Sequence, residues 1–201
     1  ERKPLHIHAI VKEAVKLLRA SIPATIEIHE DIDASAGIVI ADPTQIHQVI
    51  VNLCTNAAQA MQKRGGLLTI GLAPVELTAD DIKTYADLSP GSYVQLDVSD
   101  TGTGIDPQII SRIFDPFFTT KEIGRGTGMG LAVVHGIVKS YKGAISVQSQ
   151  PGQGSSFRVL LPRIQEAAHV EHDDVSPLPR GSERILFIDD EAALIEAAHI
   201  M

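Results

Sequence analysis

Four glycines at every second position, from Gly124 to Gly130, stand directly before an apolar helical pattern that runs to about Val138. Glycine lets the backbone approach a ligand closely, and the unpaired N–H groups of a first helical turn attract anions. Lys121 and Arg125 flank this run and are able to reach phosphate oxygens, although single surface cations are more often only solvated. The pattern predicts a phosphate cradle, with a flexible hinge before a helix as the alternative.

Asn52 and Asn56 lie four residues apart in a segment whose apolar residues recur at three- and four-residue steps. On a helix this spacing places both amides on one face, one turn above the other. Neutral amide oxygens suit a Mg²⁺ ion that arrives with phosphates attached, because that ion keeps several waters and takes few protein ligands. The two asparagines therefore predict a metal and phosphate site, with an ordinary polar helix face as the alternative.

Asp100 follows a strand-like run, residues 93–98, and opens the sequence Asp-Thr-Gly-Thr-Gly, which ends at Gly104. A carboxylate at a strand end is able to accept a hydrogen bond from an exocyclic amine such as that of adenine, and Gly102 and Gly104 leave room for a flat ring. A tight turn capped by Asp100 is one alternative. Aspartic proteases also present a carboxylate in Asp-Thr-Gly, but that hypothesis needs a second such sequence or a homodimer and leaves the asparagine pair unexplained.

Phe114, Phe117 and Phe118 form a phenylalanine cluster within five residues of a loop-like segment. Clustered aromatic rings on a loop indicate a docking surface. Rings that only fasten the loop to the core are an equally good interpretation.

Hydrophobic periodicity and turn residues predict an α/β fold in residues 1–163. Helices are expected at residues 7–21, 42–61 and 129–140, with a short one near 107–113. Strands are expected at residues 25–29, 37–40, 67–72, 93–98, 144–149 and 156–161. Asp42, Pro43 and Gln45 supply an N-cap, a first helical residue and a capping box, and Gly143 is expected as the C′ residue of the last helix. Residues 76–91 are expected to form a polar surface loop, and 101–127 a long loop that is either a functional lid or disordered.

Length, charge and cysteine content restrict the class of protein. The 201 residues, 44% of them hydrophobic, suffice for one α/β domain with some tail left over. With 17 basic against 25 acidic residues, the net charge of −8 argues against nucleic acid or an anionic membrane as the main partner. The single Cys54 excludes an internal disulfide and fits a core position in a reducing cytosol. No apolar run approaches the roughly 18 residues that a membrane-spanning helix needs.

The order of these sequence patterns is more specific than any one of them. It resembles the catalytic and ATP-binding domain of bacterial sensor histidine kinases, which has the Bergerat fold shared with gyrase, heat-shock protein 90 and mismatch-repair ATPases. The resemblance covers roughly residues 4–163. In that family's terms, the similar segments are the N box at 48–61, the G1 box at 100–104, the F box at 113–121 and the G2 box at 126–131.

The resemblance implies a role for each of these segments. Asn56 would hold Mg²⁺, Asp100 would accept from the adenine amine, and Ser156 would lie near adenine. The phosphates would be bound by the residues of the G2 box, which are Gly126, Thr127, Gly128, Met129, Gly130 and Leu131. The implied fold is a two-layer α/β sandwich with one mixed sheet covered by helices and a long ATP lid.

One departure from the hydrolytic relatives decides between two reactions. Those relatives carry a water-activating Glu four residues before the metal-binding Asn, where this chain has Asn52, an amide without useful basicity at neutral pH. Transfer of the γ-phosphoryl group of ATP to a protein histidine is therefore expected, rather than hydrolysis. A nucleotide-sensing or scaffold domain without transfer activity would look much the same in sequence.

The partners of this domain are expected outside the chain or at its end. None of the eight histidines precedes an acidic residue in a helical hairpin, and His29 before Glu30 comes closest but lies in a strand-like run. The acceptor histidine is therefore expected on a separate dimerisation hairpin that docks on the phenylalanine cluster. Residues 164–183 are typical of a linker, and 184–201 resemble the truncated start of a receiver domain. The chain is expected to be an excised part of a hybrid kinase. The full-length kinase is expected to be a homodimer that is cytoplasmic or attached to a membrane.

Overall fold

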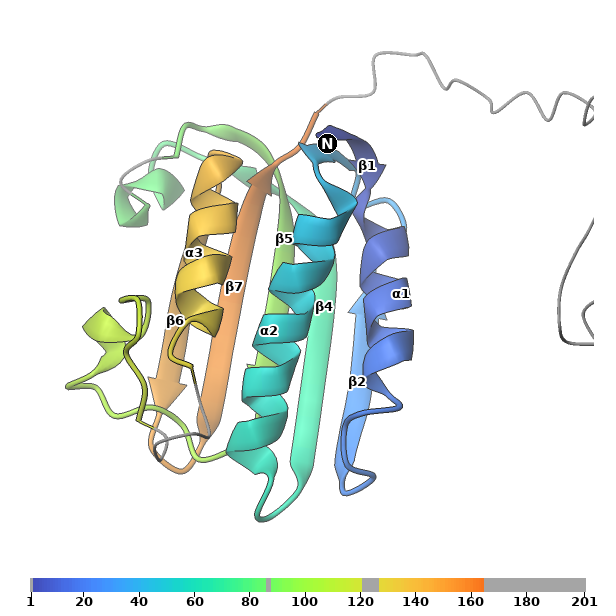
Figure 1. The fold of residues 1–201 in the computed structure, drawn as a ribbon. Helices are drawn as coiled ribbons and strands as arrows, with labels where there is room; N and C mark the ends of the chain where they lie inside the picture. The colour runs from blue at the N-terminus through green and yellow to red at the C-terminus, as the bar shows by residue number, and fades with distance from the viewer. Residues whose placement is uncertain (1, 86–87, 121–126, 165–201) are drawn as a thin grey trace, which may run out of the picture. The chain divides into compact units, whose positions relative to one another are not determined.

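The computed structural model describes residues 2–85, 88–120 and 127–164, and Figure 1 shows their arrangement. The expectations for Lys121, Arg125 and Gly126, and for the receiver-like segment 184–201, lie outside the described residues. Ile164, which the sequence assigned to the linker, forms an antiparallel bridge with Ile38. The folded domain therefore extends at least to this residue.

A mixed five-stranded sheet forms one layer of the domain, with the strand order β2-β4-β5-β7-β6. Its strands are β2 (Ile26–Ile32), β4 (Gly66–Leu77), β5 (Gly91–Asp100), β6 (Ala144–Gln150) and β7 (Gly154–Pro162). Strand β2 pairs with β4 in parallel, and the other neighbours are antiparallel. The mixed sheet expected from the sequence is thus confirmed.

Helices α1 (Ile7–Leu18), α2 (Pro43–Met61) and α3 (Gly130–Ser140) cover one face of this sheet (Figure 1). Alternate strand residues are buried beneath them, such as Leu68 of β4. Cys54 of α2 belongs to the same core, and burial raises the pKa of its thiol to about 12. The two-layer sandwich is confirmed, and Cys54 is an unreactive core residue. Among the described residues, no helix is long and apolar enough to cross a membrane.

A separate two-stranded sheet leads into α2. Strand β1 (Lys3–His6) pairs antiparallel with β3 (Ile38–Ala41). The sequence predicts β3 but not β1, because the four residues of β1 include a single buried side chain and show no alternation. After β3, the carboxylate of Asp42 accepts from the N–H of Thr44 at 2.9 Å, and Pro43 takes the first helical position. Helix α2 therefore begins where its capping residues predict.

The segment expected as a polar surface loop, residues 76–91, contributes instead to a second apolar cluster. Strand β4 continues to Leu77, and a short 3₁₀ helix, η1 (Asp81–Thr84), follows. Strand alternation places this cluster on the sheet face opposite the helices, because its strand residues alternate with those of the main core. This far-face cluster consists of Leu77, Leu88, Tyr93, Ala144 and Leu160. The loop prediction holds for most of the described residues between β4 and β5, but it missed the end of β4 and the buried Leu77 and Leu88, because isolated leucines in a polar segment give no periodic signal.

Helix α3 ends in a Schellman motif whose left-handed residue is Lys142, with φ 57°. Gly143 donates to the carbonyl of Val138 at 3.0 Å, and Lys142 donates to that of Lys139 at 2.9 Å. The expected placement of Gly143 at C′ is therefore one residue late. Gly143 is required for a different reason, because a β-carbon there would lie 2.3 Å from the carbonyl oxygen of Leu160.

Exchange of the left-handed residue tests this helix end. Lys142→Gly removes the steric cost of a β-carbon at positive φ and should raise the free energy of unfolding by about 1 kcal/mol. Gly143→Ala is the matched change one residue later and should lower it, because the new methyl group meets Leu160. Urea denaturation of both variants measures the difference, and a destabilised Lys142→Gly protein would contradict the assignment.

Candidate functional site

The two asparagines that the sequence pairs lie on α2 beside the first residue of α3. A methyl group on Gly130 would lie 3.0 Å from Oδ1 of Asn52 and 3.9 Å from Nδ2 of Asn56. Asn52 donates through Nδ2 to the carbonyl oxygen of Gln48 at 2.9 Å, which leaves its Oδ1 toward α3. Glycine at position 130 thus lets the helix start and both amides share one small volume.

The start of α3 carries the backbone N–H groups of the expected anion cradle. Its N-cap residue, Met129, makes no side-chain capping bond within the described residues, and the Met129 N–H donates to Thr127 Oγ1 at 3.4 Å. The next residues contribute first-turn N–H groups at the positive end of the helix dipole. Just before them, Gly128 has φ 65° and packs on the backbone of Phe117. The loop of the phenylalanine cluster therefore touches the segment that opens α3.

Asp100 ends β5 on the helix-covered face of the sheet and is 8% exposed. Its Oδ1 accepts from the N–H of Gly102 at 2.8 Å. Burial raises the pKa of this carboxyl, and hydrogen bonds from the N–H groups of Gly102 and Ser155 oppose the shift only in part. A buried carboxylate of this kind has the chemistry to accept a hydrogen bond from a ligand amine.

The loop after Asp100 is wedged between α2 and the turn that joins β6 to β7. Thr103 donates to the carbonyl of Ala60 on α2 at 3.2 Å and accepts from the N–H of Gly152 in the turn at 2.8 Å. Ala60 follows Asn56 by about one helical turn. The loop therefore brings Asp100 to the end of α2 that carries the asparagines.

The glycines of this loop are required because neighbouring atoms leave no room for β-carbons. At Gly102 a β-carbon would lie 2.7 Å from Oδ1 of Asp100 and 2.8 Å from Cβ of Ala60. At Gly104, where φ is 69°, it would lie 2.0 Å from the carbonyl oxygen of Gln150. Gly102 and Gly104, which were expected to leave room for a flat ring, are thus also required by the packing of the protein itself.

Ser155, rather than Ser156, lies beside Asp100. The Oγ of Ser156 accepts from Ser99 at 2.8 Å on the open face of the sheet. Ser155 is 7% exposed, and its N–H bonds to Asp100. Strand alternation is the signal that the sequence argument overlooked, because Phe157 points into the core and the residue two before it must do the same.

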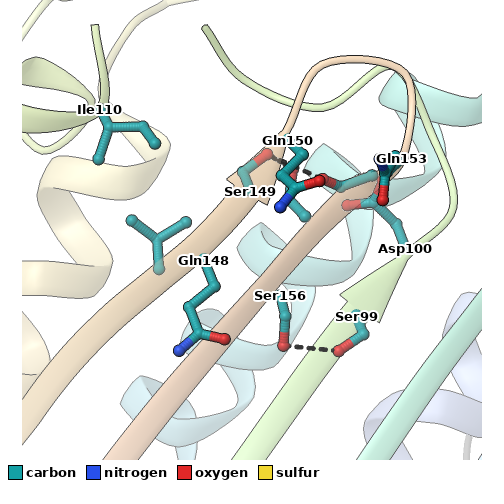
Figure 2. A pocket seen from close by; sticks show the side chains of 11 residues that line it. Ser99, Asp100, Ile110, Gln148, Ser149, Gln150, Gln153 and Ser156 are labelled. Atoms are coloured by element: carbon teal, nitrogen blue, oxygen red, sulfur yellow. Dashed lines mark hydrogen bonds between the residues drawn. The ribbon is translucent and has the colours of Figure 1, made fainter. Parts of the chain in front are cut away.

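A hollow of about 570 Å³ opens at the ends of β5, β6 and β7 (Figure 2). Most of its lining is uncharged and polar, with Ile110 contributed by the loop that follows β5. Asp100 and Ser155 line it, whereas Asn52 and Asn56 do not. Asp100 is thus common to this hollow and to the loop that reaches α2.

The three phenylalanines of the cluster differ in exposure, and both interpretations of the cluster, fastening the loop to the core and docking a partner, apply to some of them. The ring centre of Phe114 lies 5.4 Å from that of His135 on α3, the guanidinium of Arg112 lies 4.6 Å over Phe118, and both phenylalanines pack against the core. Phe117 is 74% exposed and has φ 66°. Two rings therefore fasten the loop, and Phe117 is presented to solvent.

Comparison with known families agrees with this geometry. Residues 41–165 match the family described as histidine kinase-, DNA gyrase B-, and HSP90-like ATPase. The chain belongs to this family. The matched segment contains α2, the loop after Asp100 and the start of α3, so every site described above lies within the family domain.

Two curated relatives of this ATPase-family chain are sensor kinases. It is 36% identical over 200 residues to sensor kinase CckA of Brucella abortus (strain 2308), covering 94% of this chain and 21% of the relative. It is 33% identical over 186 residues to sensory histidine kinase/phosphatase NtrB of Rhizobium meliloti (strain 1021), covering 90% of this chain and 46% of the relative. The chain thus spans less than half the length of these relatives.

Solved structures of histidine kinases share the fold. A nucleotide-free catalytic domain of histidine kinase ThkA matches with a TM-score of 0.64 at 26% identity, covering 81% of this chain and 96% of that chain. The mycobacterial sensor histidine kinase MprB matches with a TM-score of 0.64 at 24% identity over 82% of this chain and 100% of that chain, which supports the fold alone. The Bergerat fold expected from the sequence is confirmed. Membership of this family argues against the alternative that Asp100 belongs to an aspartic protease.

Acidic metal sites are absent from the part of the chain that the structure describes, where no group of three or more His, Cys, Asp or Glu side chains could hold a metal ion. A cation bound in the described part of this family domain would depend on neutral oxygens, such as those of the two asparagines, and on the oxygens of its own ligand.

The raised pKa of Asp100 predicts a pH-dependent difference between the protein and an Asp100→Asn variant. The folded state binds the carboxyl proton more tightly than the unfolded state, so ionisation of Asp100 destabilises the fold. The free energy of unfolding of the variant, relative to the unchanged protein, should rise as pH increases from the ordinary value of 3.8 through the raised pKa, and stay constant above it. Thermal unfolding across this pH range measures the effect, and a relative stability that falls with pH would show that the hydrogen bonds outweigh burial.

Proposed function

We propose that this domain binds Mg-ATP and donates the γ-phosphoryl group to a histidine on a dimerisation hairpin outside this chain. The observation that carries the proposal is the meeting of three elements between the middle of α2 and its C-terminal end, namely the asparagine pair, the start of α3 and the loop that follows Asp100. They supply neutral oxygen ligands, an anion cradle and a buried carboxylate, which together fit a purine triphosphate. The names of the relatives support a protein histidine kinase of two-component signalling.

Asp100 is proposed to recognise adenine. Its ionised carboxylate accepts a hydrogen bond from the exocyclic amine, and guanine, which presents a carbonyl oxygen at that position, is rejected because two acceptors would face each other. Ser155 is proposed to lie beside the bound ring, since its backbone already bonds to Asp100, and Ser156, which lines the same hollow, is proposed to lie near adenine as well. Gly102 and Gly104 keep the loop close enough to α2 for a ring to lie against it.

The phosphates are proposed to lie at the start of α3, on the backbone N–H groups of the segment from Gly126 to Leu131. Lys121 and Arg125 are proposed to approach the phosphate oxygens from the lid. Asn56 is proposed to hold Mg²⁺ because an amide offers a hard, neutral oxygen ligand, and its Nδ2 already lies near Gly130 at the start of α3. When bound, the ion supplies positive charge that offsets the charge developing on the transferred group.

Asn52 is proposed to keep the site from hydrolysing ATP. Its Nδ2 is held by the carbonyl of Gln48, and its Oδ1 has no useful basicity, so it cannot take a proton from an attacking water. The site therefore holds the triphosphate and leaves the nucleophile and its base to the acceptor hairpin. Alone, the domain should bind ATP and transfer little.

The acceptor hairpin is proposed to dock on the phenylalanine cluster through exposed Phe117, with Phe114 and Phe118 shaping the loop beneath it. The receiver-like segment 184–201 is proposed to begin a receiver domain of the full-length protein. That protein is proposed to be a homodimer whose catalytic part acts in the cytoplasm.

Incubation with radiolabelled ATP, Mg²⁺ and the purified hairpin of the full-length protein tests this function. Label should appear on the hairpin histidine only when the domain is present, and it should be lost on treatment with acid, as expected for a phosphoramidate. Tight ATP binding without any labelling of the hairpin would instead identify a nucleotide-sensing domain without transfer activity.

Asp100→Ala removes the charged acceptor proposed for adenine. The loss of a hydrogen bond to a charged group, worth about 1.5 to 3 kcal/mol, should weaken ATP binding roughly 10- to 100-fold in a calorimetric titration. Asp97→Ala is the control, because this carboxylate of the same strand pairs with Arg158, does not line the hollow and should leave affinity unchanged. Equal ATP affinities of Asp100→Ala and the unchanged protein would remove the adenine assignment, as would equal binding of GTP and ATP.

Asn56→Ala should abolish the gain in ATP affinity that Mg²⁺ provides, because the proposed protein ligand of the ion is lost. Asn52→Ala removes the matched amide one turn earlier and should retain most of that gain. Titrations of both variants with and without Mg²⁺ compare them directly. A Mg²⁺ dependence that persists in Asn56→Ala would assign the ion to another ligand.

A further inference from the structure

The far ends of α2 and α3 are joined by one side chain. Tyr141, the C-cap residue of α3, is 8% exposed. Its hydroxyl oxygen accepts from the backbone N–H of Asp42 at 3.0 Å and donates to the Oε1 of Gln45. Asp42 is the N-cap of α2 and Gln45 lies in its first turn, so a single hydroxyl ties the last residue of one helix to the first turn of the other.

This hydroxyl occupies the middle of a capping box. In an ordinary capping box, the side chain of the third helical residue accepts directly from the N–H of the N-cap residue. Here the Tyr141 hydroxyl stands between the two partners, accepting from Asp42 and donating to Gln45. The backbone N–H of Asp42 therefore keeps its hydrogen-bond partner only while the end of α3 stays in place. These hydrogen bonds thus fix how far α3 is shifted along its axis relative to α2.

The same two helices meet again at the nucleotide end. There the contact is the close approach of Gly130 to Asn52, at 3.0 Å for a β-carbon on the glycine. With a rise of about 1.5 Å per residue, Asn56 lies roughly 21 Å along α2 from Asp42, and Gly130 lies roughly 16 Å along α3 from Tyr141. Helices are stiff over such lengths. A shift of α3 along α2 that is permitted at the Tyr141 end therefore also displaces the start of α3 relative to the asparagines.

We propose that Tyr141 is a positioning residue for Mg-ATP, acting by fixing the offset between α2 and α3. The inference rests on the proposed function, in which Asn56 of α2 would hold Mg²⁺ and the start of α3 would hold the phosphates. A nucleotide that carries the ion would then contact both helices and need their offset to be correct. A metal-free nucleotide, held by α3 and by Asp100 of β5, does not depend on it.

Tyr141→Phe is the variant that isolates the hydroxyl. The guanidinium of Arg2 lies 4.8 Å over the Tyr141 ring, and this contact and the packing of the ring are retained by phenylalanine. Tyr93→Phe is the matched control, because Tyr93 is 6% exposed and donates to the carbonyl of Ser89 at 2.8 Å within the far-face cluster. Both changes remove one hydrogen bond from a buried tyrosine and should lower the melting temperature by about 2 to 4 °C.

The readout is the ratio of ATP dissociation constants without and with Mg²⁺. In Tyr141→Phe this ratio should fall about three- to tenfold, while metal-free affinity stays within about twofold of the unchanged protein. In Tyr93→Phe the ratio should not change. Gln45→Ala, which removes the acceptor of the same hydroxyl, should lower the ratio in the same direction and serves if Tyr141→Phe does not fold.

Three results would overturn the inference. A full Mg²⁺ ratio in Tyr141→Phe or in its substitute Gln45→Ala would show that the offset is set elsewhere, and an equal loss in Tyr93→Phe would show only a general softening of the fold. An unchanged protein whose ATP affinity does not respond to Mg²⁺ would remove the metal assignment itself. The first two leave the proposed function intact, whereas the third removes its metal site as well.

Discussion

The burial of Asp100 is the constraint on which the rest of the site depends. A carboxylate that is 8% exposed is costly unless hydrogen bonds surround it, and here the N–H groups of Gly102 and Ser155 provide them. To supply these bonds the chain must turn tightly after β5, and the turn is held by Thr103 between α2 and the β6–β7 turn. Satisfying one buried charge therefore also fixes where α2 ends relative to the sheet.

The start of α2 contributes to stability, whereas the asparagines farther along it belong to the candidate site. At its start, the Tyr141 hydroxyl accepts from the backbone N–H of Asp42, and the Asp42 carboxylate accepts from that of Thr44. At its other end, the asparagine pair faces the glycine start of α3 and no bulky side chain separates them. The hydrogen bonds that join the start of α2 to the end of α3 thus help to position the asparagines against the start of α3, as is common where a scaffold positions a site.

The sequence predicts those parts of the molecule whose signals are local. The cap at Asp42, the asparagine spacing and the Asp100 glycine loop each follow from residues a few positions apart, and the structure agrees with their placement. The far-face cluster could not be found in this way, because Leu77 and Leu88 meet Tyr93 only after the sheet has formed. Ser155 was missed although strand alternation from Phe157 identifies it. The left-handed residue after α3 was placed one position late, because the sequence offers a glycine at 143 whereas the chain turns at Lys142.

The far-face cluster affects which part of the domain opens locally. Leu88 and its neighbours pack on the side of the sheet away from the helices and share no side chain with the main core. The described residues between β4 and β5, 78–85 and 88–90, are therefore expected to open and exchange their amide protons while the helix layer remains closed. Loss of this packing would expose one small apolar patch and leave the hydrogen bonds from Gly102 and Ser155 to Asp100 in place.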